Sequence, residues 1–213
     1  MRLSRDDWFR NTTWSDKIAS QFEAKLKRAR RKGQYIRIQA CTLAEHHPEI
    51  ALQLLERYFA QEDRFDEAQA HVDRATAFIA LGRLDDAVAA YEDALEAEAR
   101  IPNLLTEAGI ELPYLVAVAT LTKQYDRALK VLRKSRKHIA FPVQEFKWNA
   151  AHALIAGANE RLSEAQEFAK RALEAASKDH SGFPYHARLG LVSQEHSDVL
   201  RRLRALGCLT GNL

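Results

Sequence analysis

The stretch Leu84-Asp85-Asp86-Ala87-Val88 follows a glycine turn and opens an amphipathic run, which is typical of the second helix of a helical hairpin. Three further stretches repeat the pattern of a turn, an acidic or polar pair, an alanine and an amphipathic run: Pro48-Glu49-Ile50-Ala51-Leu52, Tyr125-Asp126-Arg127-Ala128-Leu129 and Leu162-Ser163-Glu164-Ala165-Gln166. Their marker alanines, Ala51, Ala87, Ala128 and Ala165, are separated by 36, 41 and 37 residues. A period of this length predicts an array of stacked helix pairs. Such arrays present surfaces for binding and rarely carry catalysis.

The composition favours a helical protein with a real core. The 213 residues include only eight Gly and five Pro, which argues against all-β and disordered classes. The two cysteines, Cys41 and Cys208, are most simply free thiols of a reducing compartment. The first residues lack the apolar stretch of a secretion signal, and the longest apolar run, Leu115 to Leu121, is too short to span a bilayer. We therefore expect a cytoplasmic protein.

Charge is unevenly distributed along the chain, although the formal net charge is only +3. Residues 1–47 carry a net +6, residues 48–111 a net −10 and residues 112–213 a net +7. We interpret this pattern as electrostatic complementarity between neighbouring helix pairs. Alternatively, it could steer a partner or drive self-assembly into a homo-oligomer, which raised salt would dissolve.

Turn residues and apolar periodicity predict where the helices begin and end. The expected helices cover residues 16–32 (ended by Gly33), 35–46, 48–61, 66–81, 85–99, 113–121, 126–137, 143–157, 163–177 and 195–206. Residues 103–112 do not fit the period, so we expect an insertion there, with a short turn ended by Gly109 before Pro113 starts the next helix. This insertion accounts for the longer spacing of 41 residues.

The repeated helix pairs resemble those of the tetratricopeptide repeat (TPR) superfamily. The second repeat matches best, because its large, small and tight-turn residues fall where that family places them: Phe78, Gly82, Ala87, Tyr91, Ala94 and Leu95. His46 and Lys123 stand where the family often has its turn glycine. The resemblance implies an all-α, right-handed α-solenoid. In one continuous domain, residues 1–31 would form an aromatic segment and basic helix, 32–179 four TPR-like helix pairs, and 180–213 a loop and a capping helix.

The resemblance also implies a binding face, because the first helix of each pair lines the concave groove in that family. The peptide-binding residues expected here are Arg37, Asp73, Thr76, Tyr114 and Lys147, among small or apolar neighbours such as Ala117, Ala150 and Leu154. The expected partner is a peptide or helix of another protein. The arrangement does not favour a clamp for a terminal carboxylate, because Arg37 and Lys147 stand at opposite ends. Residues 1–14, with Trp8, Phe9 and Trp14, could pack on the body or occupy the groove themselves.

A basic stripe offers an alternative function. Arg127, Lys130, Arg133, Lys134 and Lys137 share one side of the helix expected at 126–137, where they could contact phosphates. This spacing indicates a possible nucleic-acid-associated factor. No aromatic residue interleaves with the stripe, so the pattern does not suggest stacking on single-stranded bases.

Motifs of catalysis and metal binding are absent from the sequence. We find no glycine-rich phosphate loop, no Gly-x-Ser-x-Gly and no His-Glu-x-x-His, and the eight His are scattered. Cys41 lies in an apolar stretch of a helix, so we expect a buried, inert thiol. The sequence therefore predicts no enzyme activity, no metal and no cofactor.

Overall fold

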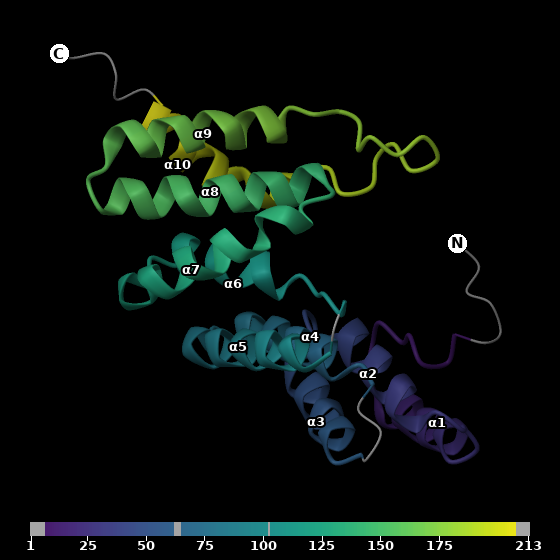
Figure 1. Ribbon diagram of the computed structural model, residues 1–213. Helices are drawn as coiled ribbons and strands as arrows, with labels where there is room; N and C mark the ends of the chain where they lie inside the picture. Colours follow the sequence, from purple (N-terminus) through teal and green to yellow (C-terminus); the bar gives the residue numbers. More distant parts are fainter. Residues whose placement is uncertain (1–6, 62–64, 102, 208–213) are drawn as a thin grey trace. The chain divides into compact units, whose positions relative to one another are not determined.

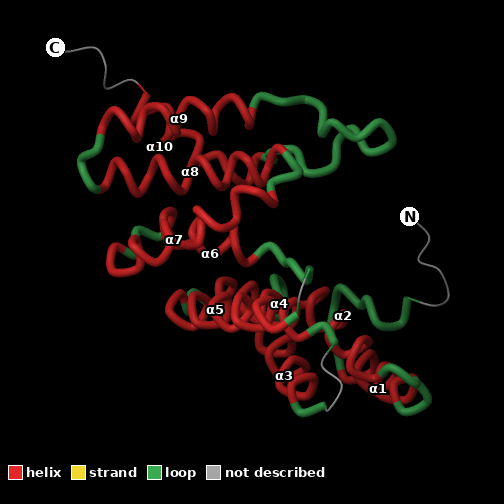
Figure 2. Tube along the Cα trace, in the orientation of Figure 1, coloured by secondary structure: helices red, strands yellow, loops and turns green. Residues whose placement is uncertain are grey.

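The described part of the chain, residues 7–61, 65–101 and 103–207 of a computed structural model, consists of helices and loops without a strand (Figures 1 and 2). The α-helices are α1 (Asp16–Leu26), α2 (Lys32–Leu43), α3 (Pro48–Phe59), α4 (Glu67–Ala80), α5 (Leu84–Arg100), α6 (Ala108–Val118), α7 (Tyr125–Ser135), α8 (Pro142–Ala158), α9 (Leu162–Ala176) and α10 (Ser197–Gly207). Three short 3-10 helices accompany them: η1 (Thr122–Gln124), η2 (Arg136–His138) and η3 (Gln194–His196).

The chain divides into two compact units, residues 1–108 and residues 109–213. Unit 1 contains the pairs α2/α3 and α4/α5 with the additional helix α1. Unit 2 contains the pairs α6/α7 and α8/α9 with α10 at its end (Figure 1). The expected all-α fold of helix pairs, with one extra helix before them and one after them, is confirmed. That residues 1–31, 32–179 and 180–213 together form one continuous domain stays a prediction.

Alanines occupy the closest contacts between helices. The four marker alanines are at most 1% exposed, and Ala75 and Ala94 are completely buried. Their single methyl groups let two helices approach closely, while Phe22, Tyr58 and Phe146 fill the wider gaps. Replacing such an alanine by a larger residue would push the helices apart, at a cost of about 1–3 kcal/mol.

The helices α4, α6 and α8 end in the same backbone turn. Gly82, Thr120 and Glu160 each have a positive φ (70°, 57° and 58°) at the second position after the helix. In each turn the following N–H bonds to a carbonyl five residues earlier: Arg83 to Phe78, Leu121 to Val116 and Arg161 to Ala156, all at 2.9 Å. This is the Schellman motif, which glycine suits best. The α2–α3 turn differs, because His46 and His47 both donate to Leu43 with no positive φ.

The alignment of Lys123 with the family's turn glycine is therefore wrong. Lys123 lies in η1, and Thr120 takes the left-handed position three residues earlier. The inserted η1 turn supplies part of the spacing of 41 residues that the sequence assigned wholly to residues 103–112.

The first helix is shorter than expected. α1 ends at Leu26, and Gly33 lies in the first turn of α2 instead of ending α1. After Leu26 the sequence has a dense run of Lys and Arg with no large apolar residue to bury. Neighbouring positive charges on one helical surface repel each other, so nothing stabilises a continuation of the helix.

The helix expected to start at Pro113 begins five residues earlier, at Ala108. Pro113 lies inside α6, and Gly109 belongs to its first turn instead of ending a separate turn. The Thr106 hydroxyl accepts a hydrogen bond from the Ala108 N–H at 3.1 Å and so caps the helix. A side chain at Gly109 would come within 3.2 Å of the Ser135 Cβ, so this glycine permits close packing of α6 and α7. The start of this helix was predicted wrongly because α6 is apolar on most sides. Its apolar residues therefore do not recur on one face, and their spacing does not show where the helix begins.

Candidate functional site

The first candidate face lies in unit 1, where α2 meets α4. Arg37 Nη1 donates to Asp73 Oδ2 at 2.9 Å, and its Nε lies 3.5 Å from Asp66 Oδ2. Gln69 Nε2 donates to Asp73 Oδ1 at 3.1 Å. Two of the expected peptide-binding residues, Arg37 and Asp73, are therefore joined in an ion pair between the first helices of adjacent helix pairs.

The Arg37–Asp73 pair is largely withdrawn from solvent. Asp73 is only 3% exposed, and burial raises the pKa of its carboxyl, although the Arg37 guanidinium opposes that shift. Thr76 lies one turn further along α4, and its hydroxyl donates to the Val72 carbonyl at 3.2 Å. Arg37 is held between two carboxylates, so it would have to leave Asp73 before it could grip a carboxylate of a partner. The face consequently has a negative balance.

Cys41 contradicts the expectation of a buried thiol, because the residue is exposed. It lies one turn after Arg37 on α2, and its side chain hydrogen-bonds to Asp73. Partial burial of the sulfur raises its pKa to about 11, and the Asp73 carboxylate adds to the increase. The thiol therefore stays protonated at neutral pH, which does not favour a nucleophile. Cys208 lies outside the described residues.

The N-terminal aromatic segment packs on the body of unit 1 over its described part, residues 7–14. The Trp8 ring lies 5.4 Å from Phe22 of α1 and 5.0 Å from Tyr35 of α2. Asn11 and Gln39 exchange three hydrogen bonds of 2.8 to 3.0 Å, which satisfy the completely buried Gln39 amide. These contacts decide between the two alternatives that the sequence left open for residues 7–14, in favour of packing on α1 and α2.

The second candidate face lies in unit 2, where α6 meets α8. Lys147 Nζ bonds to Glu111 Oε1 at 2.6 Å and lies 5.4 Å from the centre of the Tyr114 ring. The Tyr114 hydroxyl is 2.9 Å from Nδ1 of His196. Tyr114 and Lys147, both expected at the groove, are therefore close together. Neither is unpartnered.

The C-terminal segment covers this second face. His196 packs 5.1 Å from the Phe146 ring, and Arg202 Nη1 donates to the Val118 carbonyl at 2.8 Å. Val199 and Leu203 of α10 are buried. Ala117, Ala150 and Leu154, expected to line the groove, are at most 7% exposed. The face of α6 and α8 thus already holds η3 of the same chain and the Arg202 side chain, whereas the helix α10 packs mainly against α9 and α8.

The sequence interpretation missed the partners of the expected groove residues: Asp66, Glu111 and His196. One signal was present for the carboxylates. Asp73 follows Arg37, and Lys147 follows Glu111, by 36 residues, which is close to one repeat. Opposite charges at that separation face each other on neighbouring first helices. No comparable signal indicated His196.

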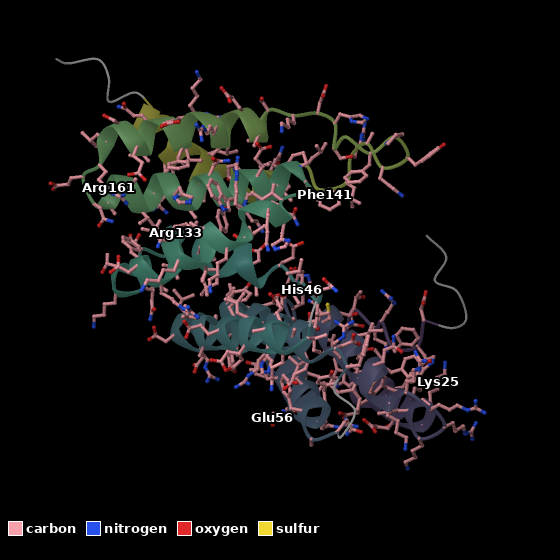
Figure 3. The ribbon with its side chains drawn as sticks, in the orientation of Figure 1. Lys25, His46, Glu56, Arg133, Phe141 and Arg161 are labelled. Atoms are coloured by element: carbon pink, nitrogen blue, oxygen red, sulfur yellow. The ribbon has the colours of Figure 1, made fainter. Side chains whose placement is uncertain are left out.

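The basic stripe is exposed along α7 and η2, as its amphipathic spacing predicts. Lys130, Arg133, Lys134 and Lys137 make no ion pair with any described carboxylate, whereas the buried side of α7 is formed by Ala128, Val131 and Leu132. Figure 3 labels Arg133 on α7. The stripe therefore presents positive charge outward from unit 2, and all five of its expected residues lie on exposed positions.

Aromatic rings lie beside the stripe, which the sequence did not indicate. Arg136 lies 4.6 Å over the Trp148 ring, and His152 stacks between Trp148 and Phe168 at 4.2 and 4.4 Å. Burial, together with Arg161, Arg133 and Arg136, lowers the pKa of His152 to about 4. Trp148 is only 8% exposed and donates to the Leu132 carbonyl, so it offers no open face for a nucleic-acid base.

Neither a metal-ligand cluster nor a membrane-spanning helix occurs among the described residues. Within them, no three His, Cys, Asp or Glu side chains are grouped so that they could hold a metal ion. Nor does any helix in the described ranges have the length and apolar character needed to cross a bilayer. The expected lack of cofactor and of catalysis stays a prediction.

Comparison with known proteins supports the repeat pattern. Residues 61–100, which contain α4 and α5, match the tetratricopeptide repeat family. Searches of curated proteins and of solved structures gave no match. The matched pair is the one whose packing residues, Phe78, Gly82 and Ala87, carried the resemblance in the sequence.

Proposed function

We propose that this chain, a tetratricopeptide-like repeat protein, is a non-enzymatic scaffold or adaptor that binds a peptide or helix of another protein. Repeats of this family generally mediate protein–protein interaction. We place binding on the face formed by the first helices of the pairs. The proposal includes the cytoplasmic location and the absence of cofactors that the sequence predicts.

One observation carries the proposal, namely that a segment of the same chain, around η3 and the Arg202 side chain, already lies on the face of α6 and α8. Segment 194–207 contacts that face through the Tyr114–His196 hydrogen bond, the Phe146–His196 ring contact and the Arg202–Val118 hydrogen bond. Its own apolar side chains, Val199 and Leu203, are buried. The first helices therefore accommodate a short chain segment held by an imidazole and a guanidinium, and we expect a partner peptide to be held in the same way.

Unit 1 offers the related face for a partner. No α10-like helix of the described chain covers Arg37, Gln69 and Thr76, which remain partly exposed. Because Asp66 and Asp73 outweigh the single guanidinium, we expect a partner helix with donor side chains such as Arg, Lys or His. The chain's own covering segment carries such groups, His196 and Arg202.

A bulky substitution on α4 tests this proposal. In Thr76→Arg a long side chain would obstruct the face, and no cross-helix hydrogen bond would be lost, because the Thr76 hydroxyl bonds only within α4. The matched control is Ala89→Arg on an exposed position of α5, the second helix of the same pair. Tagged wild-type and variant proteins would be used to capture partners from a native lysate of the source organism, with and without nuclease. Bound proteins would be identified by mass spectrometry.

The expected result is one dominant protein that survives nuclease, is retained by Ala89→Arg and is lost with Thr76→Arg. Equal capture by both variants would place binding elsewhere. Circular dichroism and hydrogen exchange of each variant establish that a loss does not come from unfolding.

The exposed basic stripe favours one alternative, a nucleic-acid-associated factor that uses Arg127, Lys130, Arg133, Lys134 and Lys137. Four of these cations have no described carboxylate partner, so phosphates could approach them. Titration of labelled RNA and duplex DNA at low and moderate salt tests this alternative. Saturable, salt-sensitive binding that Lys130→Glu/Lys134→Glu abolishes would support it, and capture that disappears with nuclease would agree.

A further inference from the structure

The connection between α9 and η3 contains a loop with its own hydrogen-bonded structure, here called the Tyr185 loop (residues 178–190). The Ser181 N–H donates to the Ala187 carbonyl at 2.7 Å, and its hydroxyl donates to the His186 carbonyl at 2.7 Å. The same hydroxyl accepts the Phe183 N–H at 3.1 Å. The buried Ser181 therefore closes the loop on itself, as in compact surface loops that often carry function.

The Tyr185 loop is also fixed to the start of α8. Val143 N–H donates to the Gly190 carbonyl at 2.8 Å, and the Phe183 ring lies 5.2 Å from the Phe141 ring. Gly190 has φ +68°, and a side chain there would meet the Phe141 side chain at 2.7 Å, so only glycine suits this contact. Figure 3 labels Phe141 at the base of the loop.

This anchored loop exposes large apolar side chains. Tyr185 is 94% exposed, Leu189 is 54% exposed and Phe183 is 42% exposed. Three such residues occur within one loop of thirteen residues, whereas apolar residues exposed singly are normal on a surface. Aromatic side chains held on a pre-ordered loop are favoured anchors of protein interfaces.

A cavity of about 520 Å³ lies at the base of the loop, within unit 2. Its apolar wall comes from Ile139, Phe141 and Pro142, and its polar wall includes Arg136, Lys178 and His180. Lys178 is joined to Glu145, also a lining residue, at 2.6 Å. The cavity thus joins one apolar wall, on which an apolar side chain can pack, to a larger polar wall that carries cationic groups.

Positive charge dominates around the loop and cavity. The loop itself carries Lys178 and Arg188 against Asp179, with His180 and His186 able to add charge when protonated. The adjoining η2 turn adds Arg136, Lys137 and His138. An acidic partner would therefore be attracted to this end of unit 2.

We propose that the Tyr185 loop and the adjoining cavity form a docking surface for an acidic peptide segment with one large apolar side chain. The apolar side chain fills the cavity, the carboxylates lie against the surrounding cations, and Tyr185 packs on the bound segment. A lipid surface is disfavoured because a bilayer does not fill a concave cavity. None of the lining residues belongs to the contacts of the α6–α8 face, so this site is independent of the proposed function.

The test uses the full chain labelled with ¹⁵N and an unlabelled heptapeptide with leucine at its centre and Asp or Glu elsewhere. We expect titration to shift the amide signals of residues 178–190, with a Kd in the range of about 0.1–1 mM for so short a ligand. Exchanging the central leucine for serine, or Tyr185 for serine, should weaken binding about tenfold or more. Arg188→Glu should also weaken binding of the acidic peptide, and the loss should be larger at low salt than at high salt.

Matched controls keep the result interpretable. Leu105→Ser removes an apolar residue of unit 1 that is as exposed (53%) as Leu189 of the loop (54%), and it should bind like the wild type. A lysine-rich version of the peptide should not bind. Failure of the acidic peptide to shift the loop signals would overturn the proposal. So would equal binding by Tyr185→Ser, or Tyr185-dependent binding only to anionic phosphatidylserine vesicles or to an oligonucleotide.

Discussion

Exchanging glycine between two equivalent turns should change stability in opposite directions. Gly82 and Thr120 occupy the same left-handed position after α4 and α6, with φ +70° and +57°. A Cβ added at Gly82 would meet nothing within 4 Å, so Gly82→Ala introduces no clash. The change in stability then reports only the free energy of the left-handed backbone conformation. For an L-residue the left-handed conformation costs about 1–2 kcal/mol, and the lower entropy of unfolded alanine offsets about 0.4–1 kcal/mol of it. We therefore expect Gly82→Ala to destabilise unit 1 by about 1 kcal/mol.

Thr120→Gly should show the reverse. The Thr120 side chain is exposed, and the hydrogen bonds of this turn join backbone groups, so only conformational strain is removed. A β-branched residue is particularly unfavourable at positive φ, so we expect about 1 kcal/mol of stabilisation in unit 2. For units of this size, 1 kcal/mol corresponds to a shift in Tm of about 4 °C.

The assay is urea unfolding followed by circular dichroism, with hydrogen exchange to assign each change to a unit. Thr76→Gly serves as the control, because the same exchange inside α4 should lower stability by about 0.3 kcal/mol through helix propensity alone, and it also removes the side-chain contacts of Thr76. A neutral Gly82→Ala, or a Thr120→Gly variant that loses stability as Thr76→Gly does, would refute the strained-turn argument.

Three further predictions follow from the buried polar groups. Tyr114→Phe deletes the hydrogen bond to His196 and should cost about 1 kcal/mol, read as faster hydrogen exchange in α10, while Tyr185→Phe at its 94% exposed position should have no effect. The pKa of His152 in the folded state is about 4, so the unfolded state binds more protons below pH 6.5. The free energy of unfolding should therefore fall by at most about 3 kcal/mol as the pH decreases from 6.5 to 4. His152→Phe should reduce this dependence in urea titrations to the part that the lowered pKa values of His71 and His196 contribute, whereas His46→Phe, at an exposed position, should leave it unchanged. Asp73→Asn should lower the pKa of Cys41, and it should therefore accelerate alkylation of this thiol at pH 8 in a Cys208→Ser background. An unchanged rate of alkylation, or an equal effect of Asp85→Asn at an exposed position, would contradict the contact between Cys41 and Asp73.

The fold was largely predictable because its signals are local. The turn, the acidic pair and the alanine of each repeat lie within a few residues, and helical periodicity reports directly which side is buried. Predicted boundaries were poorest at two helices. Charge repulsion shortens α1, and α6 is so largely apolar that the positions of its apolar residues do not show where the helix begins.

The sequence predicted where the candidate faces lie, but not which partners their residues contact. The resemblance placed Arg37, Asp73, Tyr114 and Lys147 on the first helices, and the structure brings them together in pairs within each unit. Whether they bind a peptide stays a prediction. Asp66, Glu111 and His196 were missed because their importance depends on which helix packs against which.

The sequence by itself determined a helical array with small residues at its close contacts, since a repeat near 37 residues and buried alanines permit little else. Only the tertiary structure decided that Arg37 is neutralised by Asp73, that segment 194–207 covers Tyr114, and that Thr120 and Glu160 accept a strained backbone. The physical reason is the separation of the interacting residues along the chain. Periodicity is a property of neighbours along the chain, whereas the Arg37–Asp73 and Tyr114–His196 contacts join residues 36 and 82 positions apart and exist only after packing has brought their helices together.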